Sequence, residues 1–295
     1  MRIVPPRRLV FAGGGIRVIS YVGVLEALQE RDLLRHIREV CGVSAGGLTA
    51  LMLALGYSLQ VITKFSLQYD FSNVRSLEPD DVFECMETYG IDNGENLQAL
   101  VKKMLYHKGF PPAATFKDLA ASGRCKGLRV WAADIQNVRP IEFSAQASPD
   151  VSVVFALHAT MAIPLYFTPL QHPQTGMMLV DGGVFDNYPI TLLTEAEAEE
   201  TLGVTFEFSK TPIEVQSFST FISLLTVGYY RPSYMQLLER HKCRTIVLPC
   251  GEYPFMNFEA SVEERQRLVA IGRRAADDYF KTLAKPTIHR RHSVY

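Results

Sequence analysis

The sequence lacks an excess of charge of either sign, because 30 lysine and arginine residues face 31 aspartate and glutamate residues among 295 positions. A protein drawn to nucleic acid by its overall field would carry a clear positive excess. The balance therefore predicts no nucleic-acid partner, and any anionic surface would be met through a local patch. Linkers rich in glycine, serine or proline are also missing, as are internal repeats. With 47% hydrophobic residues to build a core, a single domain over residues 1–295 is expected.

Cysteine is scarce and scattered, with five residues and no C-x-x-C pair. This pattern excludes a disulfide framework and a zinc site built on paired cysteines, and it favours a reducing compartment. The first residues, MRIVPPRRLVF, hold prolines and basic residues where a signal peptide needs an apolar stretch. Charge-free windows at 40–63 and 151–180 are broken by glycine or proline, which favours buried strands and helices over membrane spans. The expected location is the cytoplasm, with peripheral attachment to membranes where lipid is the partner.

Two strand-turn-helix units open the chain. Residues 8–12 form an apolar run that ends at three glycines, and apolar residues then recur at helical spacing over 18–30. A second run at 38–43 leads through a glycine-rich turn into an apolar helix at 48–55. Two such units in tandem predict a parallel β-sheet covered by helices.

The rest of the chain supplies further strands and helices. Residues 70–126 are more polar and mostly helical, which predicts an insertion or cap on the sheet. Further strands are expected at 128–134, 140–144, 177–180, 202–208 and 245–248. A capping box at Ser261 begins the last helix, and a basic tail covers 285–295. The fold class is therefore α/β, with a central, mainly parallel sheet flanked by helices.

The five residues Gly42-Val43-Ser44-Ala45-Gly46 fit the pattern G-x-S-x-G between a strand and a helix. On so sharp a turn a serine hydroxyl stands clear of the backbone, and the following helix N-terminus favours developing negative charge. Ser44 is therefore the candidate nucleophile. An ordinary glycine-rich turn with a helix-capping serine is the alternative.

A second glycine-rich turn, Gly13-Gly14-Gly15, follows the first strand and is followed closely by Arg17. Successive glycines can expose several backbone N–H groups on one side, as an oxyanion hole requires, and Arg17 adds positive charge nearby. Dinucleotide binding is disfavoured because Val18 stands where its fingerprint wants glycine, and a P-loop is excluded because no G-K-[ST] follows.

Asp181 ends an apolar run and precedes Gly182-Gly183, so its carboxylate can point into the same site if its strand and that of Ser44 are parallel neighbours. An aspartate that only stabilises its own turn is the alternative. A conventional triad would need a histidine later in the chain. His241, His289 and His292 lie in charged or basic runs typical of surfaces. A Ser44–Asp181 dyad is therefore the simpler hypothesis.

Three ordered motifs, GGGIR, GVSAG and DGGVFDNYP, resemble those of the patatin-like phospholipases, and similar flanking segments extend the resemblance over nearly the whole chain. The resemblance implies a three-layer α/β domain and a lipid acyl hydrolase that needs no metal or cofactor. Within it, Ser44 matches the nucleophile, Asp181 the catalytic aspartate, and Gly13, Gly14, Gly15 and Arg17 the oxyanion loop. Two departures are Val18, where the family usually has glycine, and Thr160, where it usually has serine.

The predicted reaction is acyl transfer from a lipid ester at a membrane or micelle surface, with or without a protein activator. Two alternatives stay open. One is a non-catalytic module of the same fold that binds lipid or a protein partner. The other is a carboxylesterase for small soluble esters, whose activity would not rise when the substrate aggregates.

An uncharged stretch at 215–230 offers a candidate membrane contact. Its apolar side chains recur at helical spacing, namely Phe218, Phe221, Ile222, Leu225 and Tyr229. A helix packed on the sheet and a helix docked into lipid near the active site are both consistent with this stripe. The basic residues of the tail, Lys285, Arg290 and Arg291, would add weak attraction to anionic lipid.

Overall fold

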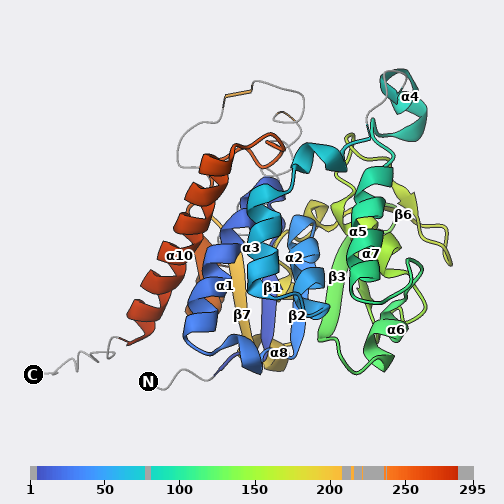
Figure 1. Cartoon of the computed structure of the whole chain (residues 1–295). Helices are drawn as coiled ribbons and strands as arrows, with labels where there is room; N and C mark the ends of the chain where they lie inside the picture. Colours follow the sequence, from blue (N-terminus) through green and yellow to red (C-terminus); the bar gives the residue numbers. More distant parts are fainter. Residues whose placement is uncertain are drawn as a thin grey trace, which may run out of the picture.

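In the computed structural model, a central eight-stranded sheet is flanked by helices (Figure 1). The structure describes residues 5–76, 81–207, 214–215, 221, 236 and 238–284. The predicted fold class, α/β with a mainly parallel sheet, is confirmed. Helix α1 packs against α10 and α3, and these helices lie side by side over one face of the sheet in Figure 1.

The elements occur close to the ranges expected from the sequence. The strands are β1 (Arg8–Phe11), β2 (Glu39–Val43), β3 (Gly127–Asp134), β4 (Arg139–Ser144), β5 (Leu170–Gln171), β6 (Met178–Asp181), β7 (Thr201–Phe206) and β8 (Thr245–Leu248). The helices are α1 (Tyr21–Glu30), α2 (Ala45–Ala54), α3 (Leu59–Gln68), α4 (Asp81–Thr88), α5 (Glu95–His107), α6 (Phe116–Ala121), α7 (Val153–Met161), α8 (Glu195–Glu199) and α10 (Val262–Ala284). Short 3₁₀ helices include η1 (Gly15–Ser20), η3 (Phe71–Val74) and η4 (Gly182–Val184).

The sheet has the strand order β5-β6-β3-β2-β1-β7-β8, and β4 pairs with β3. The pairs from β3 through β2, β1 and β7 to β8 are parallel, whereas β4 and β6 both pair antiparallel with β3. The expectation that the strands before Ser44 and Asp181 are parallel neighbours is therefore wrong. The chain reaches β6 from its antiparallel partner β5, without the crossover that a parallel neighbour of β3 would require.

The register of β3 brings the ends of β2 and β6 together. Strand β4 pairs along β3 from Arg129 to Asp134, so β2 and β6 must share the opposite edge of β3. On that edge Val43, the last residue of β2, pairs with Trp131, and Asp181, the last residue of β6, pairs with Ala132. Two strands running in opposite directions thus end at adjacent positions of a third strand. The residues that follow β2 and those that end β6 are forced into one place.

Candidate active site

Ser44 occupies the sharp turn between β2 and α2. Its backbone has a φ of 54° and a ψ of −136°, a left-handed conformation that a residue with a side chain rarely adopts. The turn is possible because Gly46 lets the helix approach β1: a Cβ on Gly46 would stand 2.4 Å from the carbonyl oxygen of Ala12. The Ser44 side chain is nearly buried. These features are typical of a nucleophile turn.

Asp181 is buried beside it, with a carboxylate that is poorly compensated. The amide of Gly183 donates to Oδ1 at 2.7 Å, while Oδ2 is buried without a hydrogen bond of ordinary geometry in the described residues. Burial raises the pKa of Asp181 to about 7, although the nearby Ser44 hydroxyl and the Gly183 amide both oppose the rise. A carboxyl group with this pKa can act as a base near neutral pH.

The loop of Gly13, Gly14 and Gly15 lies against Ser44. A Cβ on Gly13 would stand 3.0 Å from Ser44 Cβ. Asn187 holds Gly13 on both sides, because its backbone carbonyl accepts the Gly13 amide at 3.0 Å and its Nδ2 donates to the Gly13 carbonyl at 2.9 Å. The amides of Gly14 and Gly15 donate to no acceptor within the described part of the chain. They, rather than the Gly13 amide, are available to an oxyanion.

Arg17 lies behind this loop, against aromatic rings. Its guanidinium carbon is 5.3 Å from the centre of the Phe206 ring and 5.5 Å from that of Phe255. The carbonyl of Phe255 also accepts the Ile16 amide at 2.8 Å, and a Cβ on Gly15, whose φ is +52°, would collide with it. Arg17 is not among the residues that line the cavity at Ser44. Its contacts suit a role in fixing the loop.

A narrow apolar cavity of about 80 Å³ opens on Ser44. Apart from Ser44 and the backbone of Gly15 and Ala45, every lining side chain is apolar. These side chains are Ile16, Val18, Ile19, Leu48, Phe71, Val74, Leu97, Met161, Ile163, Phe167 and Phe258. They come from η1, α2, η3, α5, the end of α7, the loop between α7 and β5, and the loop before α10, so no single sequence pattern predicts them.

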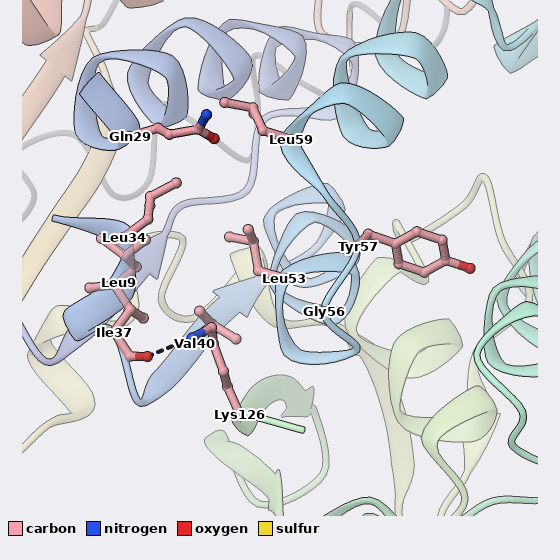
Figure 2. A pocket seen from close by; sticks show the side chains of 10 residues that line it. All are labelled: Leu9, Gln29, Leu34, Ile37, Val40, Leu53, Gly56, Tyr57, Leu59 and Lys126. Atoms are coloured by element: carbon pink, nitrogen blue, oxygen red, sulfur yellow. Dashed lines mark hydrogen bonds between the residues drawn. The ribbon is translucent and has the colours of Figure 1, made fainter. Parts of the chain in front are cut away.

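A larger cavity lies at the opposite end of the strands. It measures about 210 Å³ and is lined by residues near the amino ends of β1 and β2, including Leu9 and Val40, together with the nearby Leu53 and Lys126 (Figure 2). The Lys126 ammonium donates to the Ile37 carbonyl at 2.7 Å along its wall. The described residues that line this cavity include no serine, cysteine, aspartate or glutamate. Size alone therefore does not identify the reactive site.

The remaining predicted positions are only partly described. Phe221 is helical, with 46% of its surface exposed. Phe218, Ile222, Leu225 and the basic tail at 285–295 lie outside the described residues, as do His289 and His292. In the ranges that the structure describes, no histidine hydrogen-bonds to Ser44 or Asp181.

The same described ranges contain neither a membrane-spanning helix nor a metal-binding cluster. No described helix is both long and apolar enough to cross a bilayer. No group of three or more histidine, cysteine, aspartate or glutamate side chains there is arranged to hold a metal ion.

The chain resembles known proteins in sequence and in fold. The family model of the patatin-like phospholipases matches residues 9–194. The uncharacterised protein R571 of Acanthamoeba polyphaga mimivirus is 25% identical over 277 residues, which cover 90% of this chain and 91% of R571. The probable lipid hydrolase 463L of Invertebrate iridescent virus 6 is 25% identical over 189 residues, 63% of this chain and 62% of that protein.

A solved structure shows the same fold. The crystal structure of VipD from Legionella pneumophila has a TM-score of 0.61 at 20% identity, over 95% of this chain and 67% of VipD. The family match over residues 9–194 includes the three motifs, and the sheet has the fold of this solved structure. The chain belongs to the patatin-like phospholipase family.

Proposed function

We propose that this protein is a lipid acyl hydrolase of the phospholipase A or lysophospholipase type, with Ser44 as nucleophile and Asp181 as general base. One observation carries the proposal. A serine in a left-handed turn lines an otherwise apolar cavity, and a buried aspartate with a pKa of about 7 lies beside that serine. A carboxylate with a pKa near neutrality beside a serine hydroxyl suits acyl transfer, and apolar walls suit a hydrocarbon chain.

In the first half of the reaction, Ser44 Oγ attacks the carbonyl carbon of the ester while Asp181 takes its proton. The carbonyl oxygen becomes an oxyanion, for which the amides of Gly14 and Gly15 are donors, together with that of Ala45 at the start of α2. The intermediate collapses to an acyl-Ser44 ester. The leaving alcohol departs with the proton that Asp181 held.

In the second half, a water molecule attacks the acyl carbonyl and gives a proton to Asp181. Collapse of this intermediate releases the fatty acid, and the proton returns to Ser44 Oγ. Asp181 thus begins and ends the cycle as a carboxylate, and no other acid or base is required. The raised pKa matters because an aspartate at its ordinary value of about 3.9 is a weak base at neutral pH.

The proposal is tested with the purified full chain on a panel of phospholipids, lysophospholipids, galactolipids and triglycerides, beside a short soluble ester. Ser44→Ala and Asp181→Asn should each lower turnover by roughly a thousandfold or more, and the double variant should be little worse because the pair acts as a unit. Replacing His241, His289 and His292 together by glutamine should leave turnover largely intact.

The outcomes separate the alternatives. Lipid binding without turnover, equal in wild type and Ser44→Ala, would identify a binding module. Turnover that does not rise when substrate passes from monomer to aggregate would identify a soluble carboxylesterase. Additive losses in the double variant, or loss in the folded histidine variant, would refute the dyad.

A further inference from the structure

Among the described residues, the backbone amide of Ser44 has a single partner, which lies on a distant helix. Because β2 ends at Val43 and the chain turns sharply, the Ser44 amide leaves the ladder that joins β2 to β3. It donates instead to Thr160 Oγ1 at 2.9 Å, near the carboxyl end of α7. The Thr160 hydroxyl is a donor in turn, to the carbonyl oxygen of Trp131 at 2.5 Å. This one hydroxyl therefore bridges the turn after β2 and strand β3, and it satisfies both backbone groups.

The carbonyl of Trp131 lies where β2 and β6 meet. Trp131 pairs with Val43 on one side of that junction, and the next residue, Ala132, pairs with Asp181. A Cβ on Gly182 would stand 2.2 Å from the same carbonyl oxygen, so the chain that leaves Asp181 packs directly on it. Thr160 thus bonds to the turn that holds Ser44 and to β3, the strand with which both β2 and β6 pair.

The same short segment also holds Asp181. The Asp181 amide donates to the carbonyl of Ala162 at 2.7 Å, two residues beyond Thr160. Thr160 itself is completely buried. Its methyl group has a separate contact, since Cγ2 lies 3.2 Å from the position that a Cβ on Gly47 would take. Hydroxyl and methyl therefore perform different tasks: the first bonds to the Ser44 turn, and the second fills space beside α2.

We infer that Thr160 is a positioning residue for the nucleophile, acting through its hydroxyl to hold the Ser44 amide in the strained turn and to join that turn to β3. The inference rests on the proposed function of Ser44 and adds a residue to its support. Positive φ at a residue with a side chain persists only where the surroundings impose it. Here the surroundings act on the Ser44 amide. Without Thr160 that amide would be buried with no hydrogen-bond acceptor, which is costly.

The chain offers a matched pair of variants. Thr160→Val keeps the methyl group and removes the hydroxyl, while Thr160→Ser keeps the hydroxyl and removes the methyl. For a short soluble ester, Thr160→Val should lower kcat by about tenfold to a hundredfold with KM little changed, because small misplacement of a nucleophile costs about that much. Thr160→Ser should retain kcat within about threefold, because the methyl group contributes packing and not the hydrogen bond to Ser44.

Two further measurements separate positioning from lost stability. Both variants are assayed well below their melting temperatures, and Ser44 is titrated with a serine-reactive fluorophosphonate, which gives the fraction of active protein. Hydrogen exchange of a peptide that spans Ser44 should be faster in Thr160→Val and unchanged in Thr160→Ser.

Equal kcat in wild type and Thr160→Val, or equal losses in both variants, would overturn the inference while leaving the proposed function standing. If wild type neither hydrolyses any ester nor reacts at Ser44, the proposed function has failed. Exchange at the Ser44 peptide then decides whether Thr160 holds the turn, and unchanged exchange in Thr160→Val would refute it.

Discussion

Asp181→Asn should make the protein more stable above neutral pH while it abolishes turnover. The carboxylate of Asp181 is buried, and only Oδ1 receives a hydrogen bond of ordinary geometry in the described structure. Asparagine has nearly the same shape and no charge. Its Oδ1 can still accept the Gly183 amide. A residue held in an unfavourable state for the sake of reactivity is expected to cost stability.

The magnitude follows from the pKa of Asp181, which burial raises from 3.8 to about 7. Below pH 3.8 the carboxyl group is protonated in both the folded and the unfolded protein, so it contributes no pH dependence. Between these values the folded protein keeps a proton that the unfolded chain has lost, and the free energy of unfolding falls as the pH rises. By pH 8 this loss in the free energy of unfolding amounts to about 4 kcal/mol, because each unit of difference between the two pKa values is worth about 1.4 kcal/mol.

The assay is urea unfolding of wild type and Asp181→Asn at several pH values from 4 to 8.5. The free energy of unfolding of Asp181→Asn should be close to that of wild type at pH 4 and should exceed it by as much as about 4 kcal/mol above pH 7. Asp134→Asn is the control of opposite sign. Burial alone would raise the pKa of Asp134, but hydrogen bonds from Asn137, Arg139 and Gln136 outweigh it and hold the pKa below its usual value. Its substitution should destabilise the protein at neutral pH.

A difference in the free energy of unfolding that does not change with pH would refute this reasoning. So would an Asp181→Asn variant that is less stable than wild type at pH 8. Either result would mean that the carboxylate is solvated or paired in solution. The raised basicity assigned to Asp181 would then lose its physical cause.

Three further outcomes are expected. The value of kcat/KM for a short ester should rise with pH through about 7 and then level off, because Asp181 must be deprotonated to accept a proton; a pH–rate profile that stays flat between 5 and 9 would contradict this. Gly14→Pro removes one amide of the loop and should lower kcat by at least about a hundredfold, whereas near-normal kcat in the folded variant would move the oxyanion hole elsewhere. Phe221→Ser combined with Leu225→Ser should weaken vesicle binding and micellar turnover and spare the short ester, as the exposed Phe221 side chain favours; joint loss of both activities with a lowered melting temperature would indicate a core helix.

The local turns of the site could be predicted from the sequence because their chemistry is local. A serine flanked by small residues between a strand and a helix predicts a sharp turn like that found at Ser44. The three glycines at 13–15 predict a loop with backbone amides that donate to no acceptor in the described residues. The α/β class followed from the same tandem units. In each case the local sequence pattern is enough to indicate the turn, although the bond that holds the Ser44 amide comes from a distant helix.

The long-range geometry could not be predicted in this way. The antiparallel direction of β6, and hence its end-to-end meeting with β2, depends on pairing between Ala132 and Asp181, which leaves no periodic trace in either segment. Asn187 stands within a motif that was recognised, yet its double hydrogen bond to Gly13 required the fold to bring them together. Thr160 was visible only as a departure from a family pattern.

The contact between Phe255 and the glycine loop has a consequence for how the protein is made. The Phe255 carbonyl accepts the Ile16 amide and packs on Gly15, so a residue near the end of the chain secures a loop near its beginning. During synthesis the serine and the aspartate leave the ribosome long before residue 255 does. Contacts between such distant residues form late, because the loop they close is long. A chain that stops before Phe255 therefore carries Ser44 and Asp181 without this contact to the glycine loop, and such a truncated chain should lack the proposed hydrolysis.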